Sequence, residues 1–103
     1  MNRPCCIWLD GAARKACKVI KARLLPLGYT VKCNSQMHDR TMEHIARMLG
    51  CIIFSSDRHP EPNDVPPRVA WIYLPQDLIV RKNARDLATY IIKLAFGKFR
   101  MGR

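Results

Sequence analysis

Cys51-Ile52-Ile53-Phe54, at residues 51–54, is the apolar run that decides how the rest of the chain is arranged. A strand needs apolar side chains at every position only where both of its faces are covered, as in the interior of a parallel sheet. Gly50 comes before the run and Ser55 follows it, and both residue types favour a turn. The run therefore predicts a short, central, buried strand.

Two helices and two strands are expected before this run. The nearer helix is predicted from Asp39 to Leu49, with Asp39 as its N-cap and Gly50 just beyond its end. The farther helix must end near Leu25, because Pro26 cannot continue it. The expected strands are Cys5–Leu9 and Tyr29–Cys33. Apolar residues at helical spacing define the inward side of the two helices: Ala13, Ala16, Cys17, Ile20 and Leu24 in one, and Met42, Ile45, Ala46 and Leu49 in the other.

After the run, Ser55–Arg68 contains four prolines and is predicted to be a long loop. A strand is expected at Val69–Leu74, and Leu78–Val80 is either a further short strand or a packed connection. A last helix is predicted from Asn83 to Phe96, with Gly97 as its stop. Its inward residues are expected to be Ala84, Leu87, Ala88, Ile91 and Ala95.

Alternating strands and helices joined by tight turns predict parallel pairing and right-handed crossovers. We expect a single α/β domain over residues 1–103, with a basic C-terminal tail at about 97–103. The simplest arrangement is a small open, mostly parallel sheet of about four strands in the order 2-1-3-4 with helices on both faces, which resembles flavodoxin-like and Rossmann-like folds. In this arrangement the first and last helices cover the same face of the sheet.

The net charge of +10 comes from two separate segments. Residues 11–25 hold five basic residues and no acidic one, and residues 81–103 hold seven basic residues and one acidic one. The predicted topology makes these segments neighbours on one basic face. Lys and Arg side chains that neutralise phosphates bind nucleic acid without sequence preference.

The leading hypothesis is therefore a non-enzymatic binding protein that docks on nucleic acid or another polyanion. Its expected polyanion-binding residues are Arg14, Lys15, Lys18, Lys21, Arg81, Lys82, Arg85, Lys93, Lys98 and Arg100. An acidic protein surface is an alternative partner for the same face. A homodimer, or a place in a larger assembly, is expected through an exposed sheet edge near Trp71 or Tyr73.

A second candidate site lies where the strands end. Ligands of open α/β sheets bind outside the carboxyl ends of the strands, and a possible ligand pocket is expected there. Its residues are Asp10, Gly11, Ser55, Ser56 and Asp57. This site would suit a small nucleotide-acting enzyme, although the same residue types also form turns and helix caps.

Cysteine and histidine residues predict neither a disulfide framework nor a metal site. The five cysteines are an odd number without a C-x-x-C pair, and we expect them to be mostly buried thiols. Cys33, His38 and His44 do not have the spacing of a closed zinc motif. We accordingly expect no cofactor, no insertion into a membrane because no apolar run is long enough, and an intracellular, cytoplasmic location.

Leu24–Val31 and His44–Ser56 resemble segments of receiver domains, TIR domains and nucleoside deoxyribosyltransferase-like proteins. The resemblance consists of a Leu-x-x-x-Gly-x-x-Val turn and a helix that leads into a buried strand. It implies the architecture and a module with a site at the carboxyl ends of the strands. A TIR-type hydrolase implies a catalytic Glu in a helix after the third strand, where this chain has Glu61 between two prolines. A receiver implies paired acids after the first strand, which are absent, so the sequence assigns no family.

Overall fold

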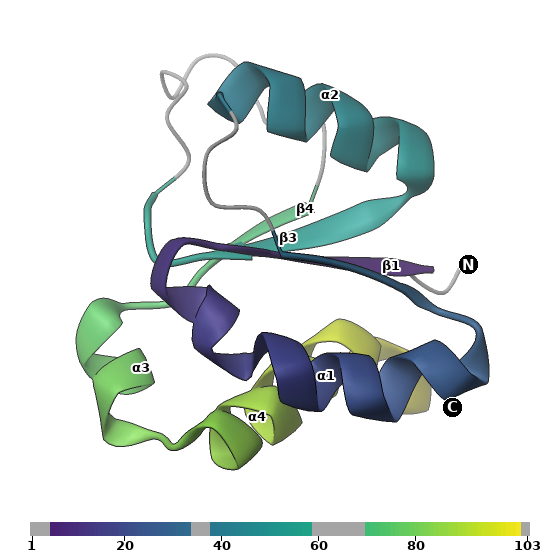
Figure 1. Cartoon of the computed structure of the whole chain (residues 1–103). Coiled ribbons are helices and arrows are strands. Elements are labelled where there is room, and N and C mark those ends of the chain that lie inside the picture. Colours follow the sequence, from purple (N-terminus) through teal and green to yellow (C-terminus); the bar gives the residue numbers. More distant parts are fainter. Residues whose placement is uncertain (1–4, 34–37, 59–69, 102–103) are drawn as a thin grey trace.

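The apolar run at residues 51–54 lies in the strand β3 (Cys51–Ser55), between two parallel neighbours. The structure is a computed structural model, and it describes residues 5–33, 38–58 and 70–101. The sheet has the order β2-β1-β3-β4, in which β1 is Cys6–Asp10, β2 is Thr30–Cys33 and β4 is Ala70–Tyr73 (Figure 1). All three strand pairs are parallel. The predicted α/β fold, strand order and strand direction are confirmed.

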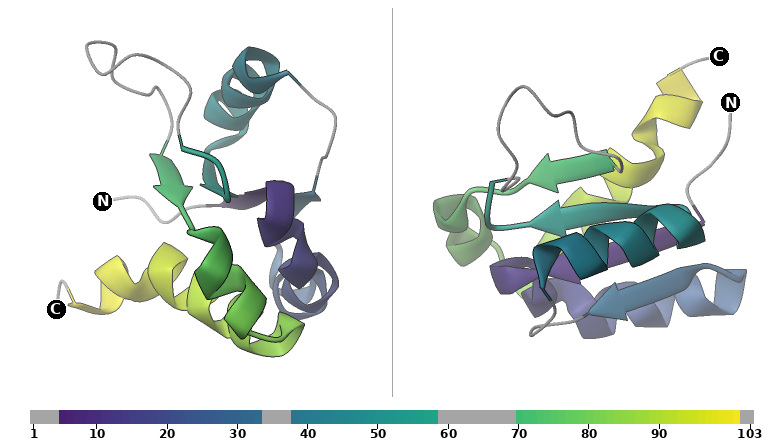
Figure 2. Two further views of the ribbon diagram at one scale, coloured as in Figure 1. Left: turned by 90° about the vertical axis from the view of Figure 1, so that its left-hand side faces the viewer. Right: turned by 90° about the horizontal axis from the view of Figure 1, so that it is seen from above.

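Helices cover both faces of this sheet (Figure 1). The helix α2 (Asp39–Leu49) lies on one face. On the other face, the chain passes through η1 (Gly11–Ala16), α1 (Cys17–Leu24) and η2 (Leu25–Leu27), and this segment packs beside α4 (Ala84–Met101). Figure 2 shows α1 and α4 side by side below the strands. The expected placement of the first and last helices on one face is confirmed.

The sheet separates two apolar layers. Ile7, Leu9 and Phe54 point toward α1 and α4, where they meet Ile20 and Ile91. On the opposite face, α2 covers a smaller cluster. The buried members of that cluster are Cys6, Trp8, Met42, Ala46, Cys51 and Ile53. Leu9, Ile53 and Phe54 are fully buried, whereas Ile52 and Trp71 are half-buried, so the run at residues 51–54 is not equally covered at every position.

Two local predictions were wrong, and an open one was resolved. Leu78–Val80, for which a strand and a packed connection were both open, lies in a short helix, α3 (Gln76–Arg81), which connects β4 to α4 and packs through the buried Ile79. The helix α4 continues through Gly97 to Met101, since one glycine costs a helix only about 1 kcal/mol. The cap of α2 is His38, whose Nδ1 accepts a hydrogen bond from the Arg40 N–H, and Asp39 is already the first helical residue.

Four of the five cysteines form disulfides, which corrects the expectation of free thiols. Cys6 and Cys51 are directly opposite each other in the β1–β3 register, with their Cα atoms 4.2 Å apart. Cys17 begins α1, and it is bonded to Cys33 at the end of β2. Cys5 is a free, exposed thiol. The sequence does not show these pairs, because only the strand register and the placement of α1 bring the bonded cysteines together.

Over the described ranges, no helix is both long enough and apolar enough to cross a membrane.

Candidate functional site

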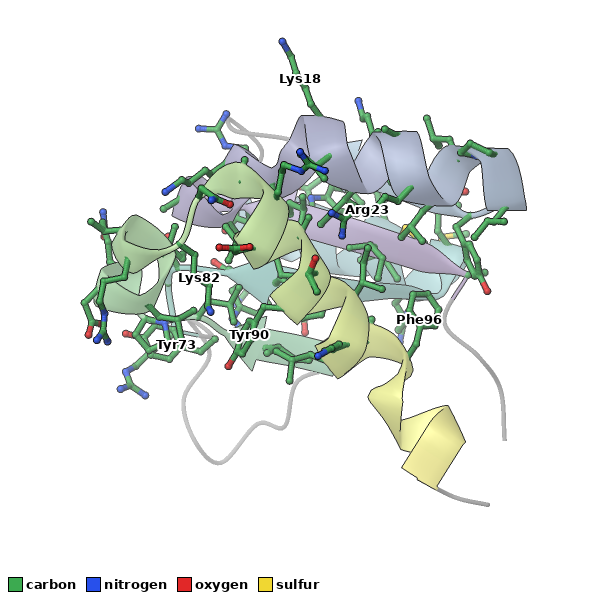
Figure 3. The ribbon with its side chains drawn as sticks, turned by 90° about the horizontal axis from the view of Figure 1, so that it is seen from below. Lys18, Arg23, Tyr73, Lys82, Tyr90 and Phe96 are labelled. Carbon is green, nitrogen blue, oxygen red and sulfur yellow. A yellow bond between two sulfur atoms is a disulfide. The ribbon has the colours of Figure 1, made fainter. Side chains whose placement is uncertain are left out.

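A direct contact joins the two basic segments. The Arg23 guanidinium of α1 donates a hydrogen bond to the Thr89 hydroxyl of α4, with Nη1 and Oγ1 2.7 Å apart. Figure 3 shows Arg23 between the two helices. Arg85 and Lys93 lie one helical turn before and after Thr89, so Arg85, Thr89 and Lys93 lie in one line along α4. Arg23, Arg85 and Lys93 are all exposed, and we call these three residues the inter-helix ridge.

Lys15 has a structural role within the predicted basic face. Its ammonium group donates to the Ile79 carbonyl at 3.0 Å and also to the Lys82 carbonyl. These carbonyls lie at the end of α3, where helical carbonyls lack partners within the helix. Lys15 therefore ties η1 to the end of α3, and much of its hydrogen-bonding capacity is already used.

Lys82 and Arg81, two further cations of the predicted basic face, also contact other side chains. The Lys82 ammonium lies 5.0 Å from the ring centroid of Tyr90, within cation–π range (Figure 3). Arg81 pairs with Asp77 at 3.4 Å, and both side chains are about three-quarters exposed. An exposed pair of this kind contributes about 1 kcal/mol at most. Both cations stay close to the surface but are less available than Arg85 and Lys93.

Lys18 projects from the side of α1 that faces away from α4 (Figure 3). Lys21 follows Lys18 by three residues and shares that side of the helix, and both are exposed. Arg14 is exposed in η1, and its Nε donates to the Gly11 carbonyl at 3.1 Å. The predicted cations of α1 therefore lie on a different side of the helix from Arg23. The side chains of Lys98 and Arg100 are outside the described part of the structure.

Arg23 was missing from the predicted binding residues. It lies five residues after Lys18, which rotates it by about 140° around the helix. The pattern of apolar residues identifies the buried side of α1 but does not show which of its flanks faces a neighbouring helix. Only the packing of α4 against α1 shows that Arg23 is the cation between them.

The residues of the second candidate site do come together at the carboxyl ends of β1 and β3. The buried Ser55 hydroxyl donates to Asp10 Oδ2 at 2.8 Å and accepts a hydrogen bond from the Asp57 N–H at 3.0 Å. The Ser56 hydroxyl accepts from the Ala12 N–H at 3.0 Å, which ties the start of η1 to the end of β3. Gly11 has a left-handed φ of 61°, and a Cβ there would lie 2.5 Å from the Ser56 hydroxyl oxygen.

These contacts support the structural interpretation of the strand ends. The hydroxyl groups of both serines bond within the chain, and among the described residues no cluster has the composition of a metal site. A receiver-like acid pair is not formed at the end of β1, where Asp10 is bonded to Ser55. Glu61, the residue considered for a TIR-type activity, lies outside the described residues. No protein-family model, curated protein or solved structure matches this chain.

Proposed function

We propose that this protein is a non-enzymatic nucleic-acid-binding protein that contacts the phosphate backbone through the inter-helix ridge. The observation that carries the proposal is the Arg23–Thr89 contact, which sets a cation of α1 between two cations of α4. Arg85 and Lys93 are about 12 Å apart along the helix axis, so the ridge offers three charges to successive phosphates. No enzymatic step is assigned to the chain.

The charges around the ridge favour an anionic partner. Residues 11–33 contain no acidic residue, and residues 87–103 contain none either. Asp86 is exposed in the first turn of α4, where its own N–H is bonded to the Asn83 side chain. An anion that approaches α1 and α4 therefore meets an excess of positive charge, which speeds association and strengthens non-specific binding.

The salt dependence of binding tests the proposal. If three cations contact duplex phosphates, log affinity falls with a slope of about −2.7 against log salt, so affinity drops about 40-fold between 50 and 200 mM salt. Removing two contacts with Arg85→Gln and Lys93→Gln should flatten the slope by about 1.8 and weaken binding equally for all sequences. Arg47→Gln is the control, because Arg47 is an exposed cation on α2, across the sheet.

Fluorescence anisotropy with duplex and single-stranded oligonucleotides measures these changes. Absence of binding at 20 mM salt would refute nucleic-acid binding and favour the acidic-protein alternative. An equal loss per charge removed, in the single Arg47 variant and in the double ridge variant, would show that overall charge, rather than the ridge, accounts for binding.

Self-association remains a prediction. β4 is the last strand of the sheet, as an exposed-edge dimer requires. However, the Trp71 indole donates to the Asp57 carbonyl at 3.0 Å, and the Arg58 guanidinium lies 4.4 Å from the Tyr73 ring centroid. These contacts cover part of both aromatic side chains. Sedimentation over a concentration series would show whether a dimer forms.

The intracellular location also remains a prediction, and one of the arguments for it no longer holds. It was inferred partly from unpaired cysteines, whereas two disulfides are formed. Disulfides persist mainly in oxidising compartments, with hyperthermophile cytoplasm as an exception. Fractionation of cells that express the protein would locate it.

A further inference from the structure

The turn after α1 holds two exposed leucines. Leu25 is 50% exposed and Leu27 is 70% exposed, on either side of Pro26 in η2. The turn is closed by backbone hydrogen bonds from Gly28 to Leu25 and from Tyr29 to Leu24, and Gly28 has a left-handed φ of 90°. The two leucines are therefore presented by an ordered turn.

The first of these leucines continues the line of cations that projects away from α4, and Leu27 lies two residues beyond it in the same turn. Lys18, Lys21 and Leu25 are spaced i, i+3, i+7, which places them on one side of α1. Lys18 points outward, away from the inter-helix ridge (Figure 3). We call Lys18 and Lys21 of α1, together with Leu25 and Leu27 of the adjoining η2, the outer stripe. Along the helix axis, Lys21 lies about 6 Å and Lys18 about 10 Å before Leu25.

We propose that the outer stripe docks the protein on an anionic lipid surface. The order of its side chains along α1 matches the layers of a bilayer surface: the leucines enter the headgroup–acyl boundary, and the lysines face the lipid phosphates one to two turns farther out. Interfacial segments bury apolar side chains about 5–10 Å into the headgroup–acyl boundary, and nearby lysines are attracted to anionic headgroups. The proposed contact is peripheral, and no segment crosses the bilayer. The length of the apolar runs in the sequence therefore did not predict it.

The charge of the surroundings argues for this occupant over the others. A second copy of the chain on the same stripe would bring like charges together, because residues 11–33 contain six basic residues and no acidic one. Nucleic-acid phosphates would engage the lysines but leave the leucines in water. An anionic bilayer satisfies both groups at once, and the proposal does not depend on the inter-helix ridge.

Vesicle co-sedimentation tests the proposal, with phosphatidylcholine vesicles that contain 30% phosphatidylserine and with vesicles of phosphatidylcholine alone. We expect binding to the anionic vesicles only. Leu25→Ser with Leu27→Ser should weaken it at least tenfold, and Lys18→Gln with Lys21→Gln about 25-fold, since each cation near the surface contributes about fivefold. Met48→Ser is the apolar control, because Met48 is 72% exposed on α2.

Three outcomes would overturn the proposal. The first is no binding to anionic vesicles at 50 mM salt, which would leave an acidic protein as the partner of the stripe. The second is binding that the leucine variants do not weaken, and the third is an equal loss from Met48→Ser. Circular dichroism shows whether each variant is folded. The leucine variants should bind oligonucleotides like the unmodified protein, so failure here is distinct from failure of nucleic-acid binding.

Discussion

Breaking the Cys17–Cys33 disulfide should destabilise the fold by an amount that follows from the chain between its ends. The two residues are 16 positions apart, and in the chain-entropy treatment closing such a loop in the unfolded state contributes about 3 kcal/mol. The Cys6–Cys51 disulfide spans 45 positions and by itself contributes about 4 kcal/mol. Because the first loop lies inside the second, the inner link shortens the outer loop to roughly 30 residues, and both together contribute about 6–7 kcal/mol.

This sum is comparable to the whole stability of a typical domain, which is about 5–15 kcal/mol. Reduction of both disulfides should therefore unfold much of the population at 37 °C. Cys17→Ser with Cys33→Ser should lower the free energy of unfolding by about 3 kcal/mol, measured by urea denaturation. Cys5→Ser is the control, because the Cys5 thiol is exposed and free, and it donates to the Leu49 carbonyl at 3.2 Å. Its effect should stay within about 0.5 kcal/mol.

Thiol titration decides whether the reasoning holds. The protein, purified without reductant and unfolded in guanidinium, should show one reactive thiol before reduction and five afterwards. Five reactive thiols before reduction would refute the disulfides. Equal stability of the Cys17/Cys33 double variant and the unmodified, oxidised protein would refute the loop-entropy estimate.

Three further predictions concern the packing that supports the sites, and each is measured by chemical denaturation. Gly11→Ala should cost about 2–4 kcal/mol, because the backbone has a left-handed φ and the added Cβ would also press on the Ser56 hydroxyl. Gly28→Ala measures the cost of the left-handed φ alone, because nothing lies within 4 Å of its added Cβ, and it should cost about 1 kcal/mol. Ile53→Ala should cost about 2–5 kcal/mol, since Ile53 is fully buried between β1, β4 and α2; a loss below 1 kcal/mol would contradict this packing. Ser55→Ala should cost about 1–3 kcal/mol, because it removes both hydrogen bonds of a buried hydroxyl, those to the Asp10 carboxylate and from the Asp57 N–H; an unchanged midpoint would argue against this network.

The architecture could be predicted from the sequence, because hydrophobic periodicity and the turn-forming Gly and Pro residues are local signals. The unbroken run at 51–54 indicated a strand covered on both faces, and Pro26 set the end of the first helix to within one or two residues. Right-handed crossovers then leave few arrangements of four parallel strands. That restriction is why the order β2-β1-β3-β4 and the common face of α1 and α4 could be predicted before any contact was known.

Features that depend on distances between residues far apart in the sequence could be seen only once the chain was folded. Cys6 and Cys51 meet because of strand register, and nothing near either residue in the sequence signals the other. Arg23 belongs to the inter-helix ridge because α4 packs on one flank of α1, and Lys15 caps α3 because the turn after β4 returns to η1. Hydrophobic burial determines which side of a helix faces the core, but it does not determine which neighbours the exposed side chains meet. The placement of surface charges and thiols therefore follows from packing geometry, which local patterns do not encode.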